Sequence, residues 1–353
     1  MNEGFIAQSH LSNNRNDEAR QEIDEEITLL EKHLLGLRAA RNALAPIYDL
    51  PTEVMTTIFL LVFYSSTPKG HLSLVLSWVS QRWREIALGI PTLWTVVDTV
   101  KVDIPSYITR SHHNPLSFIL PKLNAERMYC VPQVLKEQER IEHLDLRLHW
   151  RIEEEQVAFF KEFCNPIPVM KTLTLFGFRI PAPPFHQLAP CLTHLTLYEC
   201  ATHWPTFPSC PELTSLTITT PSTSMPIDHC LNVLQLAPKL RTLNLREALH
   251  TTIFGPLVPV DLLDLQDLSI SGERGDVLVV LLQNLVFAKV TSVVIKASHN
   301  SEPIQSAILE KVQIAIDSPN KPITSLHVAT NINDGFHQGN FFILIDDNLN
   351  IFW

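Results

Sequence analysis

Residues 192–218 read LTHLTLYECATHWPTFPSCPELTSLTI, and this segment contains the pattern from which the architecture of most of the chain can be predicted. It contains two copies of the pattern apolar-x-x-Leu-x-Leu, the second with Ile in the last place, and their middle leucines are Leu195 and Leu216. Because the side chains of a β-strand alternate between its two faces, each copy predicts a short strand that buries its leucines on one face. Six further copies occur, with the middle residues Leu144, Leu173, Leu243, Leu268, Val293 and Leu326.

The spacing of the eight copies predicts how the strands are arranged. Consecutive middle residues are 21 to 33 positions apart, and most of these spacings fit the period of about 20–29 residues that is typical of leucine-rich repeats. One copy cannot bury its own apolar face, so neighbouring copies must stack. The sequence therefore predicts an irregular α/β solenoid over residues 95–353, with a degenerate earlier strand at residues 116–120. An ordinary α/β sheet is the alternative. The return segments with helical character are residues 153–164, 230–236, 275–287 and 302–316.

The residues between and beside the buried leucines are predicted to face outward. Most of them are Thr, Ser or Asn, so this face is expected to carry few charges. Phe176 and Tyr198 hold equivalent places in adjacent copies, with Arg147 on the preceding strand. Exposed aromatic residues beside an Arg are typical anchors of protein interfaces, so the candidate target-binding residues are Arg147, Phe176, Tyr198 and Arg246. The alternative is that Thr and aromatic residues occur here because they favour strands.

Composition and charge exclude several functions. The chain of 353 residues has 27 Lys and Arg against 37 Asp and Glu, a formal net charge of −10, whereas nucleic-acid binding favours a basic balance. The ten glycines include no G-x-G pair and no G-x-x-x-x-G-K loop, so no nucleotide cofactor is expected. The longest apolar stretch, residues 277–290, is too short to span a membrane. The polar start has no signal peptide and the six cysteines form no C-x-x-C pair, so a cytoplasmic and/or nuclear protein is expected.

No set of residues predicts catalysis or metal binding. The pairs Cys191-x-x-His194 and Cys200-x-x-His203 resemble a four-ligand zinc set, but the strand pattern places His194 on the outward face and buries Cys200, which separates the ligands. No H-E-x-x-H or G-x-S-x-G occurs, and no nucleophile, base and orienting group can be assigned together. A non-enzymatic chain with no cofactor and no metal is expected.

Residues 17–45 carry a heptad pattern and follow an N-terminal tail, residues 1–16, that lacks periodicity and is expected to be disordered. The apolar residues at the two core positions of the heptads are Ile23, Ile27, Leu30, Leu34, Leu37 and Leu44. Three heptads suffice for an amphipathic helix or a short coiled coil. Two interpretations are open: the helix packs on its own chain, or it forms a dimer through residues 23–44.

Residues 46–94 carry the most specific motif. Pro51 has the backbone angle of a first helical turn, and Glu53 suits the positive end of a helix. The helix that follows has two apolar stripes, Val54, Ile58 and Leu61 in one and Met55, Phe59 and Val62 in the other. One neighbour cannot cover so wide an apolar surface, so we expect two partners, a second helix at residues 75–87 and another protein. A three-helix bundle with no outside partner is the alternative.

This segment resembles an F-box, whose pattern is Leu-Pro-x-Glu, an Ile-Phe pair and, after a linker, Val-Ser-x-Arg-Trp-Arg and a closing Leu-Trp. The matching residues are Leu50, Pro51, Glu53, Ile58, Phe59, Val79, Ser80, Arg82, Trp83, Arg84, Leu93 and Trp94. Together with the repeats that follow, the chain resembles the fungal F-box proteins with leucine-rich repeats.

The resemblance implies a function. An F-box protein of this type is the substrate-recognition subunit of an SCF-type cullin–RING ubiquitin ligase: the F-box binds the Skp adaptor, and the repeats bind a target protein. On this resemblance the adaptor-binding residues are Leu50, Pro51, Val54, Ile58, Phe59, Val79, Arg82 and Trp83. The alternative function is a non-catalytic scaffold that uses the solenoid outside any ligase.

Overall fold

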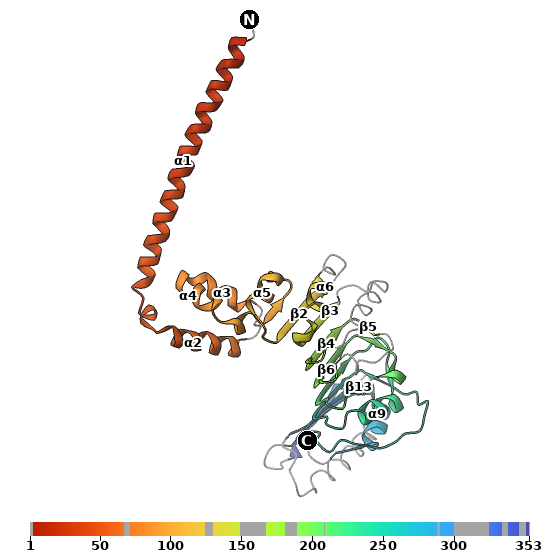
Figure 1. Cartoon of the computed structure of the whole chain (residues 1–353). Coiled ribbons are helices and arrows are strands. Elements are labelled where there is room, and N and C mark those ends of the chain that lie inside the picture. The colour runs from red at the N-terminus through yellow and green to blue at the C-terminus, as the bar shows by residue number, and fades with distance from the viewer. Residues whose placement is uncertain are drawn as a thin grey trace. The chain divides into compact units, whose positions relative to one another are not determined.

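The structure, a computed structural model, describes residues 3–66, 71–123, 130–148, 167–180, 189–207, 209–287, 290–299, 325–333, 338–345 and 351–352. The chain divides into two compact units, residues 1–94 and residues 95–353. The first unit is helical and the second is built on a β-sheet (Figure 1). Two predicted helical segments, residues 153–164 and 302–316, lie outside the described residues.

The first unit is a series of helices of very different lengths. They are α1 (Glu3–Ala43), η1 (Pro46–Asp49), α2 (Thr52–Ser65), α3 (Leu72–Val79), α4 (Gln81–Leu88) and η2 (Pro91–Trp94). The helix α1 begins within residues 1–16, for which the sequence pattern predicts disorder, and continues through the heptads. Ser80 has an extended backbone that ends α3, and its hydroxyl accepts a hydrogen bond of 3.3 Å from the Trp83 amide. Ser80 therefore caps the start of α4.

The core of the first unit forms where α2 packs against α4 and η2. Met55, Phe59 and Phe63 recur every four residues on α2 and are all buried. The ring of Phe59 lies 4.9 Å from that of Trp83, centroid to centroid. Trp94 is fully buried, and its indole N–H donates a hydrogen bond of 2.8 Å to the Ala87 carbonyl. The closing Trp of the motif is therefore a core residue with its polar atom satisfied.

The second unit is organised around one long sheet whose strands follow one another in chain order. Within the described residues the sheet has 12 strands. They are β1 (Val96–Asp98), β2 (Leu116–Leu123), β3 (Ile141–Leu148), β4 (Thr172–Phe176), β6 (His194–Tyr198), β8 (Ser215–Thr219), β10 (Thr242–Arg246), β13 (Asp267–Arg274), β15 (Ser292–His299), β16 (Ser325–Asn333), β17 (Gln338–Ile345) and β18 (Ile351–Phe352). Neighbours from β1 to β16 pair in parallel, and the last two pairs are antiparallel. The sheet is therefore mostly parallel, as a strand-and-return pattern predicts.

Each of the eight predicted strands is present, and the predicted alternation is confirmed where side chains are described. The strands β4, β8 and β10 bury only their second and fourth residues. The leucines of successive copies are in register, Leu173 with Leu195 and Leu195 with Leu216. The sheet therefore has one continuous apolar face and one face of alternating polar side chains. The degenerate copy at residues 116–120 is also a strand, β2.

The connections between the strands combine short helices with two-residue strands. The helices are α5 (Ile104–Arg110), α6 (Cys130–Leu135), α9 (Ile227–Gln235) and α10 (Gly275–Gln283), with the 3-10 turns η4 (Gln138–Arg140) and η5 (Trp204–Thr206). The strand pairs are β5 (Arg179–Ile180) with β7 (Ala201–Thr202), β9 (Met225–Pro226) with β11 (Leu249–His250), and β12 (Val260–Asp261) with β14 (Leu285–Val286). The helix predicted at 275–287 ends earlier, because the chain turns into β14.

Four consecutive copies end in the same turn. The residue directly after β4, β6, β8 and β10 has a positive φ, at Gly177, Glu199, Thr220 and Glu247 respectively. The amide of each donates a hydrogen bond of 2.7 to 3.0 Å to the carbonyl of the next copy, as from Glu199 to Thr219 and from Thr220 to Arg246. Only one of the four is a glycine, so the left-handed backbone is held by this ladder rather than by residue choice.

Candidate protein-binding surfaces

The helices α2 and α3 carry several exposed apolar side chains, which together we call the helical surface. Its most exposed members are Trp78 at 71%, Leu61 at 64% and Tyr64 at 63%. The other members are Val54, Val62, Val75 and Val79. Apolar patches of this kind on a small folded unit mark sites where another protein binds. The buried stripe on α2 faces the core of the unit, so the helix uses two sides, as its double pattern predicts.

The eight predicted adaptor-binding residues divide into three groups by exposure. Pro51, Val54 and Val79 are exposed, and Leu50, Ile58, Arg82 and Trp83 are partly exposed. Phe59 differs from the prediction, because its side chain is 0% exposed and packs against Trp83. A side chain in this position supports the surface from beneath and offers no area to a partner. The second predicted stripe, Met55, Phe59 and Val62, also differs from the structure, because the buried residues are Met55, Phe59 and Phe63 while Val62 is exposed.

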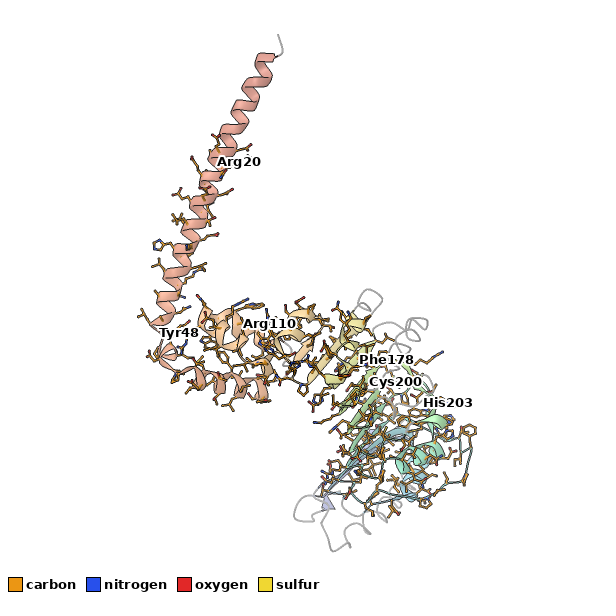
Figure 2. All side chains as sticks on the ribbon, in the orientation of Figure 1. Arg20, Tyr48, Arg110, Phe178, Cys200 and His203 are labelled. Atoms are coloured by element: carbon orange, nitrogen blue, oxygen red, sulfur yellow. The ribbon has the colours of Figure 1, made fainter. Side chains whose placement is uncertain are left out.

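Arg82 connects α4 to the segment that starts α2. Its guanidinium donates hydrogen bonds to the carbonyls of Tyr48 and Leu50, and its Cζ lies 5.4 Å from the centre of the Tyr48 ring. Tyr48 is marked in Figure 2 just before α2. The planar fork of Arg can satisfy two carbonyls at once, which the single ammonium of Lys does not do in the same geometry. Arg82 therefore fixes the Leu50-Pro51 junction, and its main contacts are internal.

The sequence analysis missed Trp78 and Val75 as members of the helical surface. Both lie on α3, whose eight residues LSLVLSWV are apolar nearly all round. Such a helix must have more than one apolar neighbour, and only Ser73, Leu76 and Ser77 of it are buried within the unit. The apolar sequence of this helix therefore indicates that Trp78 and Val75 are exposed to a partner, although the motif itself includes only Val79.

The four predicted target-binding residues lie in one line across the sheet. Strand pairing aligns Arg147 with Phe176, Phe176 with Tyr198, Tyr198 with Thr219, and Thr219 with Arg246. We call Arg147, Phe176, Tyr198, Thr219 and Arg246 the sheet row. It runs along the carboxyl ends of β3, β4, β6, β8 and β10. All five side chains are exposed or partly exposed.

Two interactions order the first three members of the sheet row. The rings of Phe176 and Tyr198 are 6.4 Å apart at an interplanar angle of 37°. Arg147 donates two hydrogen bonds to Asp145, Nε to Oδ1 at 3.0 Å and Nη2 to Oδ2 at 2.8 Å. This bidentate pair raises the pKa of Arg147 above its ordinary value. Arg147 is therefore held in position next to the aromatic pair, a geometry suited to an interface anchor.

A cavity of about 460 Å³ opens next to one end of the sheet row, and sequence reasoning did not find it. It lies beyond the carboxyl ends of β8 and β10, and its lining includes Thr220, Glu247, His250 and Leu278. The His250 ring nitrogen Nδ1 is 2.6 Å from the Thr252 hydroxyl. Two of the lining residues, Thr220 and Glu247, directly follow the row members Thr219 and Arg246, so the cavity adjoins the sheet row.

The two Cys-x-x-His pairs do not converge. Cys200 is buried, with its Sγ 3.4 Å from the Leu175 carbonyl, whereas His194 is exposed and lies 2.8 Å from the Thr193 hydroxyl (Figure 2 marks Cys200 and His203). Burial raises the pKa of the Cys200 thiol to about 11, which disfavours the thiolate that zinc requires. Among the described residues, no group of three or more His, Cys, Asp or Glu is placed to hold a metal ion.

Comparison of the chain with protein-family models, with curated proteins and with solved structures gives no match in any of the three. In the part of the chain that the structure describes, no helix is both long enough and apolar enough to cross a membrane. The two candidate protein-binding surfaces are therefore the apolar helical surface on α2 and α3 and the aromatic and basic sheet row.

Proposed function

We propose that this chain is a substrate-recognition subunit of an SCF-type cullin–RING ubiquitin ligase. In this proposal residues 46–94 form an F-box that binds the Skp adaptor, and residues 95–353 form a leucine-rich-repeat solenoid that binds a target protein. The observation that carries the proposal is the coincidence of the F-box pattern with an exposed apolar surface on α2 and α3.

The internal structure of the motif supports an F-box. Two of its polar residues have structural roles: Ser80 caps α4, and Arg82 holds the carbonyls of Tyr48 and Leu50. Its closing Trp94 completes the core. These contacts leave Pro51, Val54 and Val79 exposed on the outside of the unit. A partner that covers them would bury apolar area without disturbing the core, which favours association.

The strand array supports a repeat solenoid that recognises protein. Its copies share strand, register and terminal turn from β4 to β10. The sheet row offers two aromatic rings flanked by two arginines, the residue types that dominate interface energetics. The chain would contribute proximity: it holds the target near the ubiquitin donor, while other subunits carry out the transfer.

The test is co-elution of the chain with a purified Skp adaptor on size exclusion. The variant is Val54→Arg with Val79→Arg, which places charges on the helical surface without touching the core. Its matched control is Val258→Arg with Leu263→Arg, because these side chains are also 44% and 54% exposed but lie in the second unit. We expect the wild-type and control chains to bind and the first variant to lose at least about 100-fold in affinity.

The outcomes separate the two candidate functions. Binding that survives the Val54 and Val79 changes would mean that the assigned interface is wrong. No complex with the wild-type chain, when circular dichroism shows it to be folded, would overturn the ligase proposal. The non-catalytic scaffold would then become the working function, with the sheet row as its binding face.

A further inference from the structure

The described part of α1 has an apolar stripe that no other described element of the first unit covers. Every residue from 17 to 41 is exposed, and the side chains project from the helix on all sides, Arg20 among them (Figure 2). The stripe consists of the heptad residues Ile23, Ile27, Leu30, Leu34 and Leu37, which are between 47% and 58% exposed. A sustained heptad seam of this kind is buried by pairing with another helix.

The charges on α1 are divided between its two halves. Residues 17–31 contain seven acidic residues and one basic residue, whereas residues 32–43 contain three basic residues and no acidic one. A parallel pair of such helices would set acidic half against acidic half. In that arrangement Glu26 would face Glu31 of the second copy at the flanking g and e positions, which destabilises the pair. An antiparallel pair sets the acidic half of each helix against the basic half of the other.

We infer that α1 pairs with α1 of a second copy of this chain in an antiparallel coiled coil. One of the two registers that pair four layers of seam residues sets Ile23 against Leu34 and Ile27 against Leu30, and it brings Asp24 of one copy beside Glu31 of the other. The favoured register sets Ile27 against Leu37 and Leu30 against Leu34, each twice by symmetry. The same register brings Asp24 of each copy beside Arg38 of the other, at flanking positions that fix orientation. Its costs are one contact between the two Glu31 side chains at the centre and, at each end, the placement of Ile23 opposite Arg41. Leu44 lies beyond the last helical residue, Ala43, so a register that depends on Leu44 is disfavoured.

The first experiment measures the mass of the full chain by sedimentation equilibrium over a concentration series. The seam variant is Leu30→Asp with Leu34→Asp. The control is Leu29→Asp with Leu35→Asp, because these leucines are 67% and 63% exposed on the same helix but lie off the seam. We expect wild type and control to dimerise and the seam variant to be monomeric. A wild-type chain that is monomeric would overturn the inference and would favour packing of α1 on its own chain. A dimer that persists in the seam variant would also overturn it.

The second experiment tests orientation by charge exchange. The change Arg38→Glu places an acidic side chain beside Asp24 of the other copy twice, so we expect the dimer dissociation constant to rise about tenfold. Asp24→Arg is expected to have a similar effect, and the two changes together restore the opposite charges and the affinity. A parallel pair would behave differently, because residue 38 would then face His33 and the Arg38→Glu change would not weaken the dimer. Failure of the combined variant to recover affinity would refute the antiparallel arrangement.

Discussion

At the scale of single residues, the first unit depends on an arginine whose charge is used inside the chain. Arg82 satisfies two carbonyls that precede α2 and lies over the ring of Tyr48. The sequence predicts that Arg82 contacts a partner protein, because a basic side chain between Ser80 and Trp83 is expected to be exposed to solvent. The structure gives it a positioning role, and the adaptor would meet the Leu50-Pro51 backbone that Arg82 holds.

Arg82→Lys is expected to lower the free energy of unfolding of the first unit by about 2 kcal/mol. The charge is kept, but the fork that serves two carbonyls is lost. Urea unfolding followed by circular dichroism measures the change. Arg84→Lys is the control, because Arg84 is exposed on the same helix and should change the stability by less than ~0.5 kcal/mol. Equal effects of the two substitutions would contradict the role given to Arg82.

A buried thiol makes stability depend on pH in the alkaline range. Burial raises the pKa of Cys230 to about 12, whereas in the unfolded chain a thiol titrates near ~8.5. Above that pH the unfolded state binds fewer protons than the folded state, so the free energy of unfolding falls as pH rises. We expect Cys230→Ala to make this fall between pH ~9 and ~10 shallower by about 1.4 kcal/mol per pH unit. Urea titrations across this range test it, and identical slopes for the two chains would refute the assignment.

At the scale of elements, the strands of the second unit were predictable because their signal is local and repeated. The alternation of Leu with Thr or Ser needs only the two faces of a strand, and eight copies remove ambiguity. The row that joins Phe176 to Tyr198 followed from the same pattern, since equal positions in equal repeats must align. The terminal turns were not predictable, because Glu199, Thr220 and Glu247 have positive φ without being glycine.

The helices were harder to predict from the sequence. On α2 two apolar stripes lie side by side, and sequence alone does not tell which one the unit buries. The structure buries Met55, Phe59 and Phe63, and this choice depends on where α4 and η2 pack. For the same reason the sequence pattern does not show that the side chain of Phe59 lies in the core of the unit. The cavity beside β8 and β10 depends on loop conformation and had no sequence signal.

A matched pair of substitutions on β8 tests the assignment of its two faces. Leu216 is 1% exposed between the leucines of β6 and β10, so we expect Leu216→Ala to lower the stability of the second unit by about 2–5 kcal/mol. Thr217 is the next residue and faces the opposite side, so Thr217→Ala should cost less than ~1 kcal/mol. Chemical unfolding of both variants measures the difference. A larger loss for Thr217→Ala would mean that the strand faces are reversed.

At the scale of the whole molecule, the chain divides into two units with different architectures. The boundary falls between Trp94 and Thr95. Trp94 illustrates this division, because its hydrogen-bond partner Ala87 belongs to the same unit. The proposed receptor needs such a division, since the adaptor surface must persist whatever target the sheet row binds.

We therefore expect residues 1–94 to fold without the rest of the chain. The fragment should be helical by circular dichroism and should unfold cooperatively in urea, because Met55, Phe59 and Trp94 are 0–1% exposed and pack within it. Trp94→Ala in the same fragment should remove about 3–5 kcal/mol, since it leaves a cavity and removes the indole hydrogen bond to the Ala87 carbonyl. The helix α1 contributes helicity in both chains, so cooperativity, and not helical content, is the deciding measurement. A fragment that melts gradually, with no effect of Trp94→Ala, would show that the core of the first unit needs residues from the second.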